Sequence, residues 1–188
     1  MLRKVHVGNL IEHDLRACYG FARMQGNKRK RGPRTARRPQ GTFLLDDQLC
    51  FALYAASRAV TQRYRPLLDE VGLTFPQYLV MLVMWEEGQT TVKGLTEKLQ
   101  LDYGTLSPLL KRLAAAGYVE RTRRTDDERS VEISLTQAGI ELRDRVDQIP
   151  QLIVDAYDLD TETFAALRNA LRELADSVSS STADSQPA

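Results

Sequence analysis

The sequence has 188 residues, 43% of them hydrophobic and 27% charged, which is the composition of a globular protein with one core. Its longest apolar run, Leu79 to Trp85, is much shorter than a membrane span of about 18 residues, and the N-terminus lacks a secretory signal, so we expect a cytoplasmic protein without membrane contact. Two cysteines, Cys18 and Cys50, and two histidines, His6 and His13, form neither a disulfide framework nor a metal-ligand cluster, so no metal or cofactor is expected.

Basic residues are concentrated at the N-terminus. Residues 1–42 carry 11 basic and 2 acidic side chains, a net charge of +9, which leaves −8 for the rest of a chain whose total is +1. We predict a disordered extension over 1–42, a folded domain over 43–178, and a disordered Ser/Thr-rich tail over 179–188. The extension is interpreted either as an arm that lies along DNA phosphates or as a solvated tail upstream of a natural translation start at Met24.

The folded part begins with a long predicted helix. Its apolar residues recur every three to four positions: Leu45, Leu49, Ala52, Leu53, Ala56, Val60 and Tyr64. Asp46 and Asp47 suit its first turn, Pro66 must bend it or start a new turn, and Gly72 ends it. A second, deeply buried helix is expected to begin at Thr74, where Gln77 completes a capping box, and to stop near Gly88.

Two short helices joined by a tight turn come next. The first covers residues 91–100 and the second begins near Tyr103 and ends at Gly117, an arrangement that predicts a helix-turn-helix. Leucines cover one side of the second helix. Its other side carries small hydroxyls and cations that suit the major groove of DNA: Thr105, Ser107, Lys111 and Arg112. An ordinary solvated face is the alternative for this helix taken alone.

Two alternating segments, 118–123 and 131–135, predict an antiparallel hairpin after the helix-turn-helix. Together they indicate a winged helix. Four charged residues at or near the hairpin tip are candidates for DNA contact: Arg123, Arg124, Asp127 and Arg129. Arg129 is expected to enter the minor groove, oriented by Asp127, and solvated charge is the alternative.

Helices are also expected from Thr136 to about Ile149 and from Asp160 to about Val178. Together with the first helix, they offer more apolar surface than a winged helix of about 90 residues needs for its own core. We therefore expect the surplus apolar surface to be buried in a helical dimer interface. The predicted fold class is mainly α with a small β-hairpin wing: a winged helix-turn-helix with N- and C-terminal dimerisation helices.

Several segments resemble one family of bacterial regulators. Asp127-Glu128-Arg129-Ser130 with Leu135-Thr136 is similar to the wing of the MarR family. The resemblance to its organic hydroperoxide sensor branch, OhrR, covers about 43–178 and rests on four further segments: 49–54, 65–69, 76–79 and 101–113. It implies a homodimer that represses transcription by binding a palindromic double-stranded operator, and no enzyme activity. Residues 1–42 have no counterpart in it.

The resemblance also implies a role for Cys50. Taken alone, a cysteine among Leu49, Phe51 and Leu53 is more often an inert core thiol. In the sensor branch, the cysteine at this position reacts with organic hydroperoxide and is held by tyrosine hydroxyls and by the N-terminal end of its helix. Tyr64 matches one of these tyrosines, whereas Phe75 stands where the branch commonly has a second.

The implied mechanism is oxidation of Cys50, followed by a disulfide or sulfenamide, a change at the dimer interface and release of DNA. With no cysteine after Cys50, and with Cys18 in the extension, we expect a mixed disulfide with a low-molecular-weight thiol. Three alternatives are a MarR-type regulator controlled by a small-molecule ligand without redox chemistry, a thiol peroxidase, and a protein-docking module without a DNA role.

Overall fold

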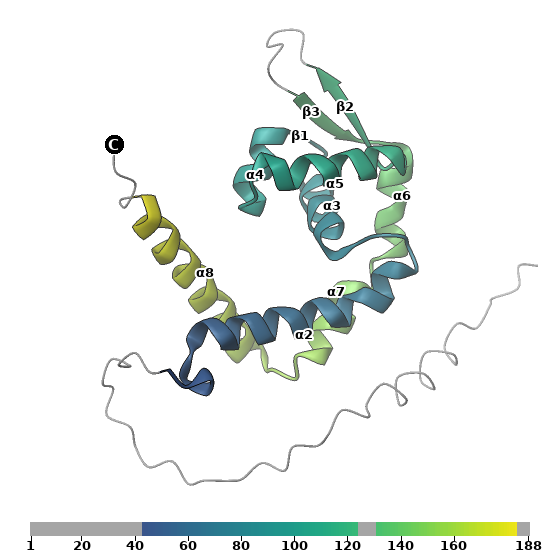
Figure 1. Ribbon diagram of the computed structural model, residues 1–188. Helices are drawn as coiled ribbons and strands as arrows, with labels where there is room; N and C mark the ends of the chain where they lie inside the picture. The colour runs from purple at the N-terminus through teal and green to yellow at the C-terminus, as the bar shows by residue number, and fades with distance from the viewer. Residues whose placement is uncertain (1–42, 124–130, 184–188) are drawn as a thin grey trace, which may run out of the picture. The chain divides into compact units, whose positions relative to one another are not determined.

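The computed structural model describes residues 43–123 and 131–183 (Figure 1). Predictions for 1–42, for the wing tip at 124–130 and for 184–188 lie outside the described residues. The elements in chain order are the short 3-10 helix η1 (Leu45–Asp47), α2 (Leu49–Asp69), α3 (Phe75–Glu87), β1 (Gln89–Thr91), α4 (Val92–Leu99), α5 (Tyr103–Ala115), β2 (Val119–Arg123), β3 (Val131–Leu135), α6 (Gln137–Arg145), α7 (Ile149–Ala156) and α8 (Thr161–Ala183).

Helix α3 forms the centre of the core, as its apolar sequence predicts. Thr74 and Gln77 make the expected capping box, in which the Thr74 N–H donates to Gln77 Oε1 at 2.8 Å. Gly88, with a φ of +72°, ends the helix in a conformation that favours glycine. Because α3 contacts α2, α4, α5, α6 and two strands, most other elements are arranged around it.

The wing is part of a three-stranded antiparallel sheet in the order β1-β3-β2. The predicted hairpin is confirmed, with Val119 opposite Leu135 and Arg123 opposite Val131. Strand β1 was not predicted, because three polar residues carry no alternating apolar pattern; it pairs with β3 through Thr90 and Ile133. The added strand joins the base of the wing to the start of α4.

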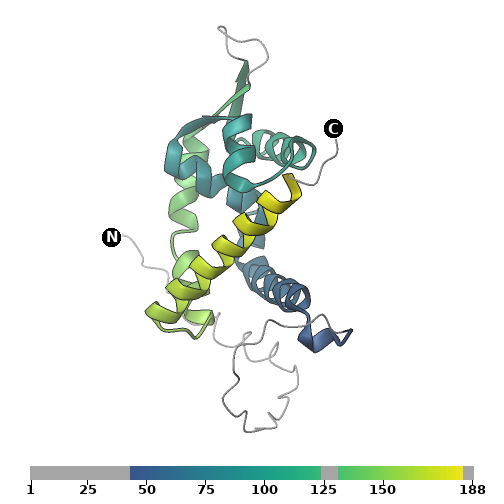
Figure 2. The same cartoon turned by 90° about the vertical axis from the view of Figure 1, so that its left-hand side faces the viewer.

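The first predicted helix is divided at its start. Asp46 and Asp47 belong to η1, and Gln48 has an extended backbone, so α2 begins only at Leu49. The helix then continues through Pro66 to Asp69. In Figures 1 and 2, α2 lies at the end of the folded unit opposite the sheet.

The helix expected from Thr136 to about Ile149 ends earlier, and a further helix that was not predicted follows it. Helix α6 ends at Arg145, and α7 begins at Ile149 with Pro150 in its first turn. A proline is tolerated at that position because the first turn leaves its N–H groups unpaired in any case, so Pro150 starts a helix that the sequence analysis missed.

The last helix is longer than predicted. Helix α8 continues to Ala183, beyond the expected end at Val178, which corrects the start of the predicted tail at residue 179. Serine is only a moderately unfavourable helix residue, so a Ser-rich run can extend a helix already formed. Within the described residues, no helix is long and apolar enough to cross a membrane.

Candidate thiol site and nucleic-acid interface

Cys50 is the second residue of α2, and its side chain is exposed in the protomer. The interpretation of Cys50 as a core thiol of its own chain is therefore wrong. Its place in the first turn puts the sulfur near the N-terminal end of the helix, where the macrodipole favours a negative charge. No cluster of three His, Cys, Asp or Glu side chains suited to a metal occurs in the described part of the chain.

Two further polar side chains lie on the same face of α2 as Cys50. Tyr54 and Arg58 follow at spacings of four and eight residues, which place all three in one row along the helix. Arg58 Nη1 donates to the Tyr54 hydroxyl at 3.0 Å, and the guanidinium carbon lies 5.6 Å from the centre of the Tyr54 ring. The sequence analysis missed this pair, although the spacing itself is the signal that identifies it.

Tyr64 occupies a half-buried aromatic cluster on the later part of α2. Its ring centre lies 4.8 Å from that of Phe75 and 5.7 Å from that of Tyr78. Burial raises the pKa of the Tyr64 phenol to about 12, with smaller contributions from nearby Tyr157 and Tyr78. Tyr64 therefore stays protonated at neutral pH and can donate a hydrogen bond to an anion.

Cys50 and Tyr64 of one chain are not brought together. Both lie on the continuous helix α2, 14 residues apart, which corresponds to about 21 Å at 1.5 Å per residue. Pro66 follows Tyr64, so any bend that it causes falls outside this segment. A contact between the two side chains therefore requires a second copy of the chain.

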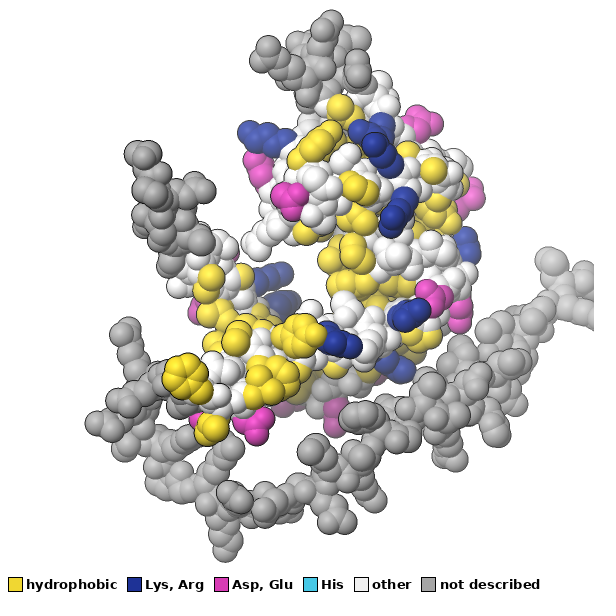
Figure 3. Space-filling model, in the orientation of Figure 1, with side chains coloured by type: hydrophobic (Ala, Val, Ile, Leu, Met, Phe, Trp, Pro, Cys, Tyr) yellow, Lys and Arg dark blue, Asp and Glu magenta, His cyan; other side chains and the backbone are white. Residues whose placement is uncertain are grey.

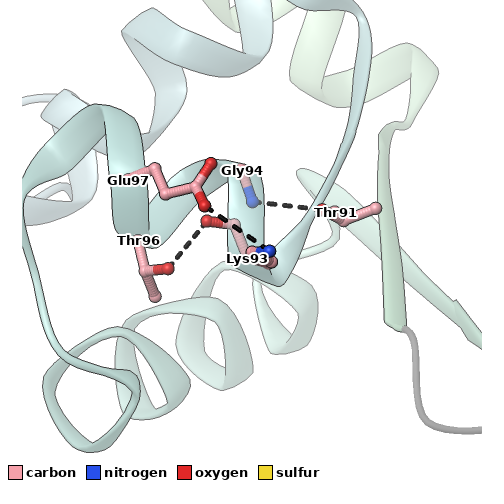
Figure 4. A network of polar contacts seen from close by, with 5 residues as sticks. All are labelled: Thr91, Lys93, Gly94, Thr96 and Glu97. Atoms are coloured by element: carbon pink, nitrogen blue, oxygen red, sulfur yellow. Dashed lines mark hydrogen bonds and ion pairs between the residues drawn. The ribbon is translucent and has the colours of Figure 1, made fainter.

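The predicted helix-turn-helix is formed by α4 and α5. The hydroxyl oxygen of Thr91 accepts a hydrogen bond from the Gly94 N–H at 3.1 Å and so caps α4 (Figure 4). In the same helix, Thr96 Oγ1 donates to the Lys93 carbonyl at 2.7 Å, and Lys93 Nζ lies 3.8 Å from Glu97 Oε1. These local contacts fix the start of the helix on which α5 packs.

Helix α5 buries its leucines and exposes the opposite face, as predicted. Lys111 and Arg112 are exposed, whereas Ser107 is half-buried. The Thr105 hydroxyl donates to the Asp102 carboxylate at 2.7 Å, and this bond, with that from the Thr105 N–H, lowers the pKa of Asp102. Because the Thr105 hydroxyl donates its proton to Asp102, its oxygen can only accept a hydrogen bond from a ligand.

The first turn of α5 also presents an aromatic residue that the sequence analysis missed. Tyr103 is 60% exposed, beside the capped Thr105. In the sequence, the signal that could have identified it is an aromatic residue in the first turn of the second helix of the helix-turn-helix. It joins Lys111 and Arg112 as a group accessible on the outer part of this helix.

The wing candidates are only partly placed. Arg123 ends β2, opposite Val131, but its side chain is not among those described. Arg124, Asp127 and Arg129 lie at the wing tip, outside the described residues. Their expected roles in DNA contact stay predictions.

Apolar side chains are exposed near Cys50 and on the last helix. Over η1 and the start of α2, they are Phe43, Leu44, Leu45, Leu49 and Phe51; on α8, they are Leu167, Leu171 and Val178. In Figure 3 apolar side chains gather at the end of the unit where η1 and α2 meet. We call these residues of η1, α2 and α8 the apolar helix surface, and a protomer that exposes them needs a partner to cover them.

Comparisons with known proteins agree with this architecture. Residues 62–146 match the family model described as transcriptional regulator SarA/Rot. The chain is 46% identical over 130 residues to the organic hydroperoxide resistance transcriptional regulator of Bacillus subtilis (strain 168), an alignment that covers 69% of this chain and 88% of the relative.

The chain is also similar to solved structures of AbfR, a protein of Staphylococcus epidermidis. Reduced AbfR bound to DNA is 37% identical with a TM-score of 0.57, and the match covers 69% of this chain and 94% of that chain. Disulfide-formed AbfR is 36% identical with a TM-score of 0.52, and the match covers 69% and 91% of the two chains.

Proposed function

Because this chain belongs to the MarR family of transcriptional regulators, in its organic hydroperoxide sensor branch, we propose that it is a DNA-binding repressor that releases its operator when Cys50 is oxidised. The observation that carries the proposal is the 46% identity over 130 residues to a regulator named for organic hydroperoxide resistance. The family consists of transcriptional regulators, which are not enzymes. A thiol peroxidase is therefore not favoured.

The proposed chemistry begins with the Cys50 thiolate. It attacks the terminal oxygen of an organic hydroperoxide, the O–O bond breaks, and the leaving alkoxide takes a proton from water to become an alcohol. Cys50 is oxidised to a sulfenic acid and the hydroperoxide is reduced. A low-molecular-weight thiol then attacks the sulfenic sulfur, so that a mixed disulfide forms and water leaves. The exposed position of Cys50 on α2 gives both reactants access in the protomer.

We propose that the working form is a homodimer in which the apolar helix surface is covered. In this dimer, Tyr64 contacts Cys50 of the partner subunit. Within one chain the two side chains are too far apart along α2 to make this contact. Helix α2 contacts α3, and α3 in turn contacts α5. A change at the thiol can therefore reach α5, whose outer face is proposed to enter the major groove.

A gel shift on the DNA upstream of the gene that encodes this protein tests the proposal. Reduced protein should retain this DNA, and cumene hydroperoxide should release it. Release by a small ligand together with indifference to hydroperoxide would favour the ligand-controlled alternative. Absence of any preferred DNA would favour a protein-docking module. The hydroxyls and cations on the outer face of α5 argue against that alternative.

The wing arginine should contribute to operator affinity. Arg129→Ala is expected to weaken binding of the operator by about 1 to 3 kcal/mol, because an arginine in a DNA groove contributes on that scale. Titration of labelled operator by fluorescence anisotropy measures the loss, and Arg143→Ala, at an exposed position of α6, is the control for removal of a cation elsewhere. Equal affinities of Arg129→Ala and wild type would reject the minor-groove role.

The basic extension should affect the affinity for DNA but not the preference for one DNA sequence over another. Removal of residues 1–42, with net charge +9, is expected to reduce the slope of log affinity against log salt concentration, because fewer counterions are released. The preference for operator over scrambled DNA should stay the same, since phosphate contacts carry no sequence information. A truncated protein that binds both DNAs equally would show that the extension reads bases.

A further inference from the structure

The hydroxyl of Thr105 has a fixed direction of hydrogen bonding. Its Oγ1 donates to Asp102 Oδ2 at 2.7 Å, and the Thr105 N–H donates to Oδ1 of the same carboxylate at 2.8 Å. These bonds, that of the hydroxyl most strongly, lower the pKa of Asp102, so the carboxylate is ionised at neutral pH and has no proton to give in return. The single hydroxyl proton of Thr105 therefore points at the cap of α5.

The exposed side of this hydroxyl retains only acceptor capacity. Thr105 is exposed and lies in the first turn of α5. In a helix-turn-helix, the side chains at the N-terminal end of the second helix are those that contact base edges in the major groove. A hydroxyl with a free proton can donate or accept, so it does not distinguish one base from another. The Thr105 hydroxyl, whose proton is held by a carboxylate, distinguishes donors from acceptors.

The major-groove edges of the four bases differ in this property. Adenine presents the N6 amino group and cytosine the N4 amino group, both donors, whereas guanine presents O6 and thymine O4, both acceptors. An acceptor that faces another acceptor leaves both without a partner where water has been displaced, which costs free energy. Lys111 and Arg112, also on the outer part of α5, carry only donors and therefore have the opposite preference.

We propose that Thr105 is a specificity-determining residue of the operator complex, and that it selects an adenine or a cytosine through the exocyclic amino group. Asp102 is the positioning residue, since it holds the Thr105 proton. The inference rests on the proposed function, because it needs α5 in the major groove. It deepens that function by naming the class of base that one position in each half of the operator carries.

The test uses the full-length chain and the DNA upstream of the gene that encodes it, shortened by footprinting to the protected duplex. In one half of this duplex, each adenine or cytosine in turn is replaced by deoxynebularine or deoxyzebularine, which lack the amino group. At one position we expect the wild-type affinity to fall about 3- to 10-fold, the equivalent of one neutral hydrogen bond. Where the selected base is adenine, 7-deazaadenine, which keeps the amino group, should have a smaller effect.

Thr105→Val distinguishes the lost hydrogen bond from weakened base pairing. Valine has the shape of threonine without the hydroxyl, and the N–H of residue 105 can still donate to Asp102. The base replacement that weakens the wild type should change the affinity of Thr105→Val by less than about twofold, because no hydrogen bond remains to be lost. Thr105→Ser keeps the hydroxyl and is the matched control, which should retain the full effect. An equal loss in Thr105→Val and wild type would overturn the inference.

Asp102→Asn tests the role of the cap. Asparagine is an equally good N-cap residue, but its amide donates to the Thr105 oxygen, so the hydroxyl proton becomes free to point at the DNA. A change of the selected base from adenine to guanine, or from cytosine to thymine, exchanges the amino group for a carbonyl oxygen. The wild type should lose affinity about tenfold or more on this change, and Asp102→Asn less than about threefold. Equal losses in the two proteins would contradict the inference.

Failure of the proposed function gives a different result. If the redox role is wrong, hydroperoxide leaves the operator complex intact while the amino-group effect at Thr105 is still measured. If hydroperoxide releases the operator and no base replacement depends on Thr105, only the present inference is overturned. A chain that prefers no duplex over a scrambled one contradicts both.

Discussion

Cys50→Ser is expected to bind the operator as tightly as the reduced wild type and to hold it fully in the presence of hydroperoxide. The wild type should lose affinity about 5- to 150-fold on oxidation, the range of a typical coupling free energy between two sites. Serine has the same shape as cysteine with a smaller terminal atom, and its hydroxyl is not oxidised by hydroperoxide, so the helix surface stays intact while the redox response is removed. Operator affinity before and after cumene hydroperoxide measures the effect.

Cys18→Ser is the matched control for this result, and it should respond to hydroperoxide as the wild type does. Intact mass spectrometry after oxidation with glutathione present should show one added thiol per chain, mapped to Cys50. A Cys18 to Cys50 crosslink as the main product would contradict the single-cysteine mechanism. Release of DNA from Cys50→Ser by hydroperoxide would contradict the role of Cys50 itself.

Gly139→Ala is expected to destabilise the folded protein by about 3 kcal/mol, at the upper end of the cost of overpacking a core. Gly139 is buried in α6, and a Cβ there would overlap the carbonyl oxygen of Tyr118 and lie 3.1 Å from Leu135 Cδ2. The Gly139 carbonyl also accepts a hydrogen bond from Trp85 Nε1 at 2.8 Å, so the helix cannot move aside without breaking that bond. Urea unfolding at fixed protein concentration measures the loss.

Gly104→Ala provides the matched control. Gly104 lies in the first turn of α5 and is exposed, and a Cβ at this position would have only Asp102 Oδ1 within 4 Å, at 3.0 Å. Alanine is the better helix residue and the Asp102 carboxylate has to yield by only a few tenths of an ångström, so the stability should stay within about 1 kcal/mol of the wild type. Equal stabilities of Gly139→Ala and Gly104→Ala would show that α6 can shift away from Tyr118.

The local elements were predictable where one sequence period dominates. Leu106, Leu109, Leu110 and Leu113 recur at helical spacing, and α5 buries all four. The alternation of Val131, Ile133 and Leu135 predicts β3, and Thr74 with Gln77 predicts the start of α3. In each case the residues that set the structure are neighbours in sequence, so propensity and periodicity agree.

The elements that were not predicted depend on contacts with residues distant in the sequence or on a choice that the local sequence leaves open. Strand β1 is three polar residues that become a strand only because β3 offers unpaired backbone groups beside them. Helix α7 was missed because the preceding helix was expected to end near Ile149, and Pro150 can either end a helix or stand in the first turn of the next. Neither choice can be made from the local sequence alone.

For the proposed sites, the sequence by itself determined the residue types: a cysteine at the start of a helix, a tyrosine 14 positions later, and cations on the outer face of α5. It also determined that Cys50 and Tyr64 cannot meet within one chain, because the rise of a helix is constant. Only the tertiary structure decided that the Thr105 proton is used by Asp102, and that the Tyr64 ring packs against the rings of Phe75 and Tyr78. The physical reason is that a hydrogen bond or a ring contact depends on distances of a few ångströms, and between the rings of α2 and α3 these distances are fixed by how the two helices pack.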